Sequence, residues 1–185
     1  MGPLMEQTKT KIGSYAPDFE LRGIDNQVHH LSRYLQRFRA VGVVTLSNHC
    51  PYVAHYVEQL NTIQTHFQSQ GFTLVGINGN DDRRYPEETF ENMQSFAKTH
   101  QLQFPYLRDT TQDVLRSFGA DCTPEAFLID ESGVLCYRGA IDDAAQQLQD
   151  AQQHYLYDAI AQLLNREAIA ITETDAIGRP IQWRG

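Results

Sequence analysis

Apolar residues are grouped in short runs along the chain, and two of these runs have the pattern of buried β-strands. Val41–Leu46 and Phe72–Asn78 are nearly continuous apolar segments rich in β-branched residues, as is typical of strands covered on both faces. Between them, apolar residues from Val53 to Phe67 recur at steps of one, three and four, which indicates a helix that closes at Gly71. A strand, a helix and a second strand in this order predict a right-handed parallel crossover.

The remaining segments extend this pattern to an α/β domain. Ala16–Leu21 and Val28–Leu31 flank a turn-like sequence and predict a small β-hairpin ahead of the first long strand. Glu125–Ile129 and Val134–Arg138 flank a tight turn and predict an antiparallel hairpin. Further elements are a short helix or turn over residues 34–38, helices over 89–100, 112–118 and 154–165, and an extended piece over 104–107. We expect a flexible arm over residues 1–12, one domain over 13–167, and an irregular tail over 168–185 that packs on or near the domain.

The composition argues against several classes of function. The 185 residues are 41% hydrophobic and 21% charged, which is ordinary for a globular domain. The formal net charge of −8 argues against nucleic acid and against anionic membranes as partners, because both repel an acidic protein. The sequence has no run of ~18 apolar residues and no legible secretory signal. We therefore expect a soluble, cytoplasmic protein.

Cys50 lies where a thiol becomes reactive. It follows the first long strand and directly precedes Pro51 and the predicted helix, so it belongs to the turn at the helix N-terminus. Unpaired backbone N–H groups and the positive end of the helix dipole stabilise a thiolate there, and Pro51 suits the first turn because its missing N–H is not needed. His49 would add positive charge when protonated. The alternative is a buried, inert cysteine.

The cysteines and histidines do not have the spacing of a structural framework. Three cysteines are an odd number and too few for a disulfide scaffold, so each is treated as an individual chemical group. His29, His30 and His49 lack the paired spacing with cysteine that a structural zinc site needs. We expect neither a metal nor a cofactor.

Several motifs, taken together, resemble those of a known family. The chain is similar to the thioredoxin-like redoxins of the alkyl hydroperoxide reductase/thiol-specific antioxidant (AhpC/TSA, peroxiredoxin-like) family, with a likeness over roughly residues 13–183. The motifs that carry it are residues 47–53, 76–78, 85–87, 104–107, 122–125 and 137–143. The resemblance implies a thioredoxin fold, with a central mixed sheet flanked by helices and the first hairpin as an N-terminal extension. It also implies antioxidant or thiol–disulfide oxidoreductase activity.

Position 47 departs from the family pattern. Similar proteins often have Cys-Asn-His-Cys where this chain has Ser47–Cys50, and often have a further cysteine near residues 178–180. With Ser47, the vicinal disulfide of a Cys-x-x-Cys motif cannot form. The hydroxyl instead resembles that of the Thr/Ser-x-x-Cys motif of peroxiredoxins, which hydrogen-bonds a thiolate that attacks peroxide and becomes a sulfenic acid. Ser47 would act on Cys50 in this way, or would only cap the helix.

Thr123 and Pro124 are the expected wall opposite the reactive thiol. In thioredoxin-like proteins a cis-proline at this point faces the active cysteine, so the resemblance implies a cis Pro124, whereas sequence alone favours a trans proline that begins an edge strand. Cys122 would then lie near the site, either as a resolving thiol that bridges to oxidised Cys50 or as a buried packing residue. Cys136, in the middle of a strand, is expected in the core.

Four further residues are candidates for supporting roles. Arg138 would supply positive charge near the thiol, or form a surface ion pair with Asp142. Glu125 would act as a proton shuttle if buried, or lie exposed on an edge strand. Asn48 and His49 would orient the thiol from the adjoining loop, with His49 as a neutral surface residue the alternative.

These residues predict a thiol-dependent oxidoreductase in which the Cys50 thiolate reduces a small peroxide or a protein disulfide. Cys122, or an external thiol such as thioredoxin or glutathione, would complete the cycle. One alternative is a monothiol disulfide exchanger or isomerase. Another is a degenerate, non-catalytic thioredoxin-fold module that binds a partner protein.

Overall fold

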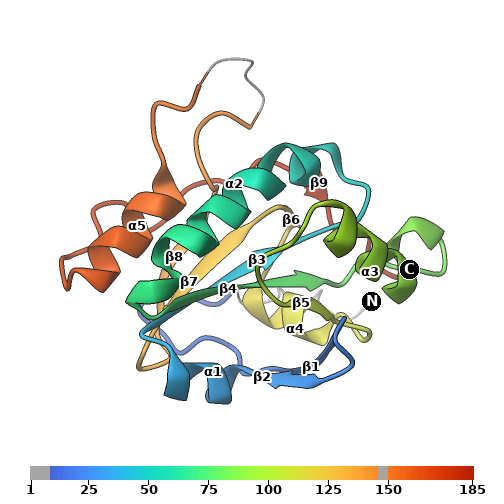
Figure 1. The fold of residues 1–185 in the computed structure, drawn as a ribbon, viewed down its shortest axis with the longest axis horizontal. Coiled ribbons are helices and arrows are strands. Elements are labelled where there is room, and N and C mark those ends of the chain that lie inside the picture. The colour runs from blue at the N-terminus through green and yellow to red at the C-terminus, as the bar shows by residue number, and fades with distance from the viewer. Residues whose placement is uncertain (1–8, 146–149) are drawn as a thin grey trace, which may run out of the picture.

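A mixed β-sheet lies between two layers of helices in the computed structural model, which describes residues 9–145 and 150–185 (Figure 1). The main sheet has the strand order β2-β1-β5-β4-β3-β7-β8. Its strands are β1 (Glu20–Gly23), β2 (Val28–His30), β3 (Ala40–Thr45), β4 (Phe72–Asn78), β5 (Tyr106–Arg108), β7 (Ala126–Asp130) and β8 (Leu135–Gly139). The expected mixed sheet flanked by helices is confirmed.

The centre of the sheet is the pair β3 and β4. The two strands are parallel, with Val43 beside Val75, and helix α2 (Pro51–Phe67) connects them, so the predicted parallel crossover is confirmed. Strand β7 pairs antiparallel with both β3 and β8. The antiparallel β1–β2 hairpin, also as predicted, joins the other side of the sheet through β5.

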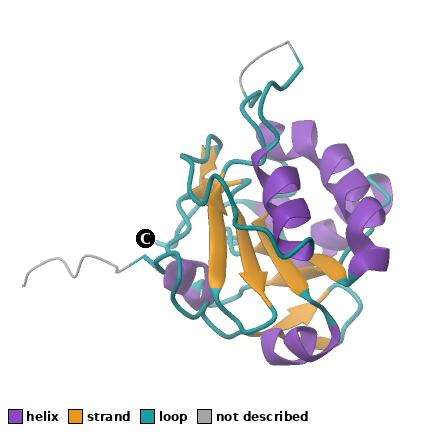
Figure 2. Ribbon diagram, turned by 90° about the vertical axis from the view of Figure 1, so that its left-hand side faces the viewer, coloured by secondary structure: helices purple, strands orange, loops and turns teal. Residues whose placement is uncertain are grey.

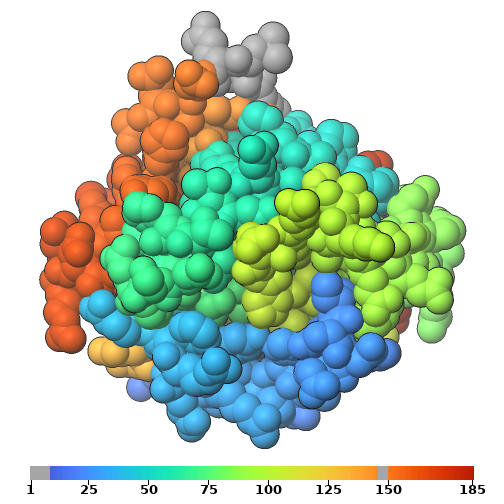
Figure 3. All heavy atoms as spheres, in the orientation of Figure 1, coloured from blue at the N-terminus to red at the C-terminus, as the bar shows by residue number. Residues whose placement is uncertain are grey.

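Alternate side chains of the sheet belong to two hydrophobic cores. The other helices are α1 (Leu31–Arg37), α3 (Phe90–Thr99), α4 (Asp113–Phe118), α5 (Tyr155–Leu164) and the 3₁₀ turns η1 (Gln68–Gln70) and η2 (Pro86–Glu88). On one face, α2, α3 and α5 pack over Val44 and Leu74; on the other, α1 and α4 pack over Val43 and Val75. Figure 2 shows the larger helical layer on one side of the sheet, and Figure 3 shows α2 and α3 at the surface of that layer.

Two very short strands are missing from the sequence prediction. Strand β6 (Cys122–Thr123) and strand β9 (Arg179–Pro180) pair antiparallel with each other as a separate two-stranded sheet. The tail was expected to be irregular because two residues, one of them a proline, carry no periodic signal. Strand β1 also begins at Glu20 rather than at Ala16, since Pro17 has no N–H to offer to a ladder.

The segments at both ends contact the domain. Residues 1–8 of the expected arm lie outside the described residues, whereas Lys9 is hydrogen-bonded to Asp121 and the Thr10 hydroxyl donates to the Ser117 carbonyl. In the tail, Ile181 is buried in the core under α4. Within the described ranges, no helix is both long and apolar enough to cross a membrane.

Candidate functional site

Cys50 is the N-cap residue of α2, and Pro51 occupies the first helical turn. Strand β3 ends at Thr45, the Leu46 N–H still bonds to β4 at Ile77, and the chain then turns into the helix. The predicted position of the thiol at a helix N-terminus is therefore confirmed. The residue is only 2% exposed, so any reaction partner must reach a nearly enclosed sulfur.

The wall opposite the thiol is formed by Thr123 and Pro124. The peptide bond between them is cis, as the resemblance implied, and the Cys50 Sγ donates a hydrogen bond to the Thr123 carbonyl at 3.5 Å. Thr45 holds the segment around the cis peptide bond in position. Its hydroxyl donates to the Cys122 carbonyl at 2.6 Å and accepts from the Glu125 N–H at 2.8 Å.

Ser47 does not have the expected contact with Cys50. Among the described residues its buried hydroxyl donates to the carboxylate of Glu88. It also accepts a weak bond from the His49 N–H at 3.4 Å, and α2 has no side-chain cap, so the capping alternative is wrong as well. The side chain points toward η2 rather than toward the thiol, because the buried carboxylate is the stronger acceptor.

Glu88 organises the loop before the cysteine, and sequence reasoning missed it. Its carboxylate is fully buried. It accepts from the Asn48 N–H at 3.2 Å and from the Asn78 amide at 2.6 Å, in addition to the Ser47 hydroxyl. His49 Nδ1 also contacts the carboxylate. A glutamate that follows Pro86-Glu87 in a polar loop carries no sequence signal that connects it with a cysteine so distant in the chain.

Asn48 and His49 therefore act on the loop rather than directly on the sulfur. The Asn48 side chain donates to the Glu87 carbonyl at 2.9 Å and accepts from the Tyr106 hydroxyl at 2.7 Å. The ring of His49 stacks on Tyr85 with 6.5 Å between the centroids. The His49 ring is therefore held on two sides, by Glu88 and by Tyr85.

Arg138 and Glu125 form a buried pair, which contradicts part of the sequence interpretation. Both residues are 5% exposed, and Arg138 Nη2 lies 3.3 Å from Glu125 Oε2. The expected surface ion pair of Arg138 with Asp142 is wrong, and so is the exposed edge position of Glu125, because the chain between Phe118 and Asp121 bonds to both side chains: Arg138 donates to the Gly119 carbonyl and Glu125 accepts from the Asp121 N–H. Asp142 instead accepts a hydrogen bond from Tyr56. Burial raises the pKa of the Glu125 carboxyl, while the Asp121 N–H and Arg138 offset part of this effect.

All three cysteines belong to the described residues and are free thiols. Cys122 is buried beside the site, and burial, with the negative charges of Glu125 and Asp121, raises the pKa of its thiol to about 12. Cys136 is half-buried rather than in the core, since it faces Asp130 at 3.6 Å on the hairpin. Burial, together with Asp130, raises the pKa of Cys136 to about 11.

The high pKa of Cys122 predicts slow alkylation of this thiol in the native protein. A rise from the ordinary value of 9.0 to about 12 lowers the thiolate fraction at pH 8 by roughly 10³, and only the thiolate attacks iodoacetamide. We expect the Cys122 rate to rise about tenfold per pH unit between pH 7 and 9. Peptide mapping of timed samples measures it, with the urea-unfolded chain as control. Equal rates in the folded and unfolded protein would contradict the prediction.

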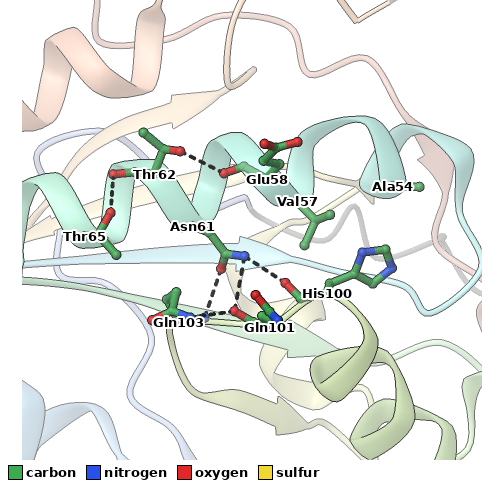
Figure 4. A pocket seen from close by; sticks show the side chains of 9 residues that line it. All are labelled: Ala54, Val57, Glu58, Asn61, Thr62, Thr65, His100, Gln101 and Gln103. Carbon is green, nitrogen blue, oxygen red and sulfur yellow. Dashed lines mark hydrogen bonds between the residues drawn. The ribbon is translucent and has the colours of Figure 1, made fainter.

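Two hollows lie along the helical layer near the site. One is lined by Asn48, His49 and Glu87 together with residues of α3, and so begins beside the cysteine loop. The larger one runs along α2 and is lined by the residues drawn in Figure 4, where Asn61 bonds to the chain at His100 and Gln103. Cys50 lines neither hollow. Within residues 9–145 and 150–185, no group of three or more His, Cys, Asp or Glu residues is arranged to hold a metal ion.

A mixed sheet of this order, with a cysteine at the N-terminus of α2 opposite a cis-proline, places the protein in the thioredoxin-like class of thiol proteins. Comparison with known proteins narrows the class. The sequence profile of the AhpC/TSA family matches residues 12–138, and the chain belongs to that family.

Three similar proteins illustrate the relationship. A hypothetical protein from Sinorhizobium meliloti 1021 is 32% identical and has a TM-score of 0.90, over 96% of this chain and 97% of its own. The thiol-disulfide oxidoreductase ResA of Geobacillus thermodenitrificans (strain NG80-2) is 28% identical over 128 residues, which are 69% of this chain and 68% of that protein. A thioredoxin family thiol:disulfide interchange protein from Chlorobium tepidum TLS shares the fold, with a TM-score of 0.61 at 22% identity over 83% of this chain and 97% of its own.

Proposed function

We propose that the protein is a thiol–disulfide oxidoreductase that works with one exchanging thiol, Cys50. The observation that carries this proposal is the Cys50 sulfur at the N-terminus of α2, hydrogen-bonded to the carbonyl before the cis-proline. Unpaired N–H groups at a helix N-terminus stabilise a thiolate. The related ResA, a thiol-disulfide oxidoreductase, supports the same chemistry.

The reaction begins with attack of the Cys50 thiolate on one sulfur of a disulfide. A bond forms between Sγ and that sulfur, the original S–S bond breaks, and the second sulfur leaves as a thiolate that takes up a proton. The product is a mixed disulfide on Cys50. That proton comes from the solvent, while His49, held by Glu88, keeps the loop before Cys50 in place.

An external thiol completes the cycle in this proposal. Its thiolate attacks the mixed disulfide, forms a new disulfide with the substrate sulfur and releases the Cys50 thiolate. Cys122 is a poor resolving thiol, because burial raises its pKa to about 12 and an attacking sulfur must be ionised. Ser47 has no sulfur to offer, so no vicinal disulfide competes with the external thiol.

Disulfide exchange fits the site better than peroxide reduction. The Ser47 hydroxyl, which would place a peroxide oxygen, donates to Glu88. The buried arginines among the described residues bond to groups other than the Cys50 thiol, near which a positive charge was expected. Arg108 donates to the carbonyls of Glu88 and Asn80, and Arg138 pairs with Glu125. Antioxidant activity through peroxide reduction is therefore the second candidate function, and the family match supports it.

The test is the product formed on Cys50. Reduced protein is mixed with hydroxyethyl disulfide, quenched with acid and analysed by mass spectrometry, and we expect one mercaptoethanol adduct on Cys50, formed about tenfold faster than on glutathione at pH 7. Cys50→Ser should form no such adduct, Cys122→Ser should behave like the wild type, and glutathione should remove the adduct. Faster reaction with hydrogen peroxide, trapped as a sulfenic acid, would favour peroxide reduction. No reaction with either oxidant would indicate a binding module.

A further inference from the structure

The C-terminal tail occupies the backbone edge that lies beside the reactive thiol. Strand β6 carries the Thr123 carbonyl that accepts the Cys50 hydrogen bond. Its edge is paired with β9, with Thr123 opposite Arg179 and Cys122 opposite Pro180. Extended peptides bind to proteins by adding a strand to such an edge. Here the chain itself supplies that strand.

Gly178 brings the tail into direct contact with the cis-proline peptide. A Cβ atom at this position would lie 2.2 Å from the Thr123 oxygen, 2.7 Å from the Thr123 carbon and 3.3 Å from the Pro124 nitrogen. Only a residue without a side chain fits there, because real Cβ atoms do not approach backbone atoms so closely. No second polypeptide strand can lie in the same place.

The tail is fixed beyond the strand as well. The Ile181 N–H donates to the Asp121 carbonyl at 3.1 Å, and its side chain is 4% exposed. Gln182 donates to the Asn80 side chain at 2.9 Å and accepts from the Asp81 N–H at 2.8 Å. Trp183 packs under the Arg116 guanidinium, 4.4 Å from the ring centroid. These contacts hold β9 against β6.

We infer that β9 determines the substrate class of Cys50: compact, low-molecular-weight disulfides react, and extended polypeptide disulfides are excluded as long as the tail is in place. This inference rests on the proposed disulfide exchange at Cys50. The 2% exposure of Cys50 agrees with it, because only a small molecule reaches so enclosed a sulfur.

Two mixed disulfides with the same leaving group test the inference. One joins thionitrobenzoate to N-acetylcysteinamide, and the other joins it to the central cysteine of an extended ten-residue peptide of glycine, serine and threonine. Release of thionitrobenzoate is followed by its absorbance. We expect wild-type protein to react with the small compound at least about tenfold faster than with the peptide.

Gly178→Ala should displace the tail from Thr123 and raise the peptide rate at least about fivefold, with the small-compound rate changed less than about twofold. Gly185→Ala is the matched control, since its Cβ would meet only Arg84 at 3.6 Å, and it should leave both rates unchanged. Trp183 is the one tryptophan of the sequence, so its fluorescence reports whether the tail has moved. Should Gly178→Ala fail to fold, Ile181→Ala removes a buried side chain of the same tail and keeps Trp183 as the reporter.

The outcomes separate the two proposals. A wild-type rate ratio near one, or an unchanged ratio in a variant whose Trp183 fluorescence shows a displaced tail, would overturn the role of β9 and leave disulfide exchange standing. If Cys50→Ser releases thionitrobenzoate from both compounds as fast as the wild type, the proposed function fails, and the inference about its substrates fails with it.

Discussion

Replacing Glu88 with alanine is expected to lower the free energy of unfolding by about 3–5 kcal/mol. The carboxylate is fully buried and accepts hydrogen bonds from the Ser47 hydroxyl, the Asn48 N–H and the Asn78 amide. Alanine removes the shared acceptor and leaves the Ser47 hydroxyl and the Asn48 N–H without it, at about 1–3 kcal/mol each before the loop relaxes. The Asn78 amide loses one bond but keeps its bond to the Tyr106 hydroxyl at 3.1 Å. Urea denaturation at pH 7, followed by circular dichroism, measures the loss.

The control is the neighbouring residue of the same 3₁₀ turn. Glu87 is exposed, so Glu87→Ala should change the free energy of unfolding by no more than about 0.5 kcal/mol. The thiol exchange rate of Cys50 should fall in Glu88→Ala and stay constant in Glu87→Ala, because only Glu88 holds His49 and the turn before the cysteine. Equal stabilities of the two variants would show that the loop is held by something other than this carboxylate.

The central part of the fold could be predicted because its signals are local. Val41–Leu46 and Phe72–Asn78 are apolar on both faces, and the helix between them has regular apolar spacing, so pattern alone leads to the parallel pair that the structure contains. The position of Cys50 could be predicted by the same reasoning, since a cysteine between such a strand and Pro51 has to lie at the helix N-terminus. The cis form of the Thr123–Pro124 bond could be predicted only from the family resemblance.

The contacts around the site could not be predicted because they join distant parts of the chain. A sequence argument offers the Ser47 hydroxyl two partners, the Cys50 thiolate as an acceptor and the N–H groups of the first helical turn as donors. In the structure it donates to Glu88 instead. The pairing of β6 with β9 depends on two residues at each side, too few for any periodicity. The sequence leaves Arg138 either near the thiol or in a surface ion pair with Asp142, and only the folded chain shows the buried Glu125 that pairs with it.

Replacing Arg138 with methionine is expected to destabilise the protein by about 3–5 kcal/mol at pH 7, because it leaves the buried Glu125 carboxylate without its charged partner. The guanidinium also donates to the carbonyls of Thr10, at 2.8 Å, and of Gly119, at 3.1 Å, so it joins the N-terminal segment to the end of α4. Urea denaturation measures the change. Arg83→Met, at an exposed position, is the control and should cost no more than about 0.5 kcal/mol.

The pH dependence identifies the cause of this loss. Burial already raises the pKa of Glu125, and removal of Arg138 raises it further, since one of the opposing charges is gone. A raised folded-state pKa contributes stability that is complete below the unfolded value of ~4.3 and is lost as pH rises through the folded value. The deficit of Arg138→Met should therefore shrink as pH falls from 7 towards 4.5. Measured against Glu125→Gln, the deficit of Arg138→Met/Glu125→Gln should be smaller at pH 7 and independent of pH, because neither protein has a carboxylate at position 125. A deficit of Arg138→Met that is constant with pH would assign the loss to the carbonyl contacts alone.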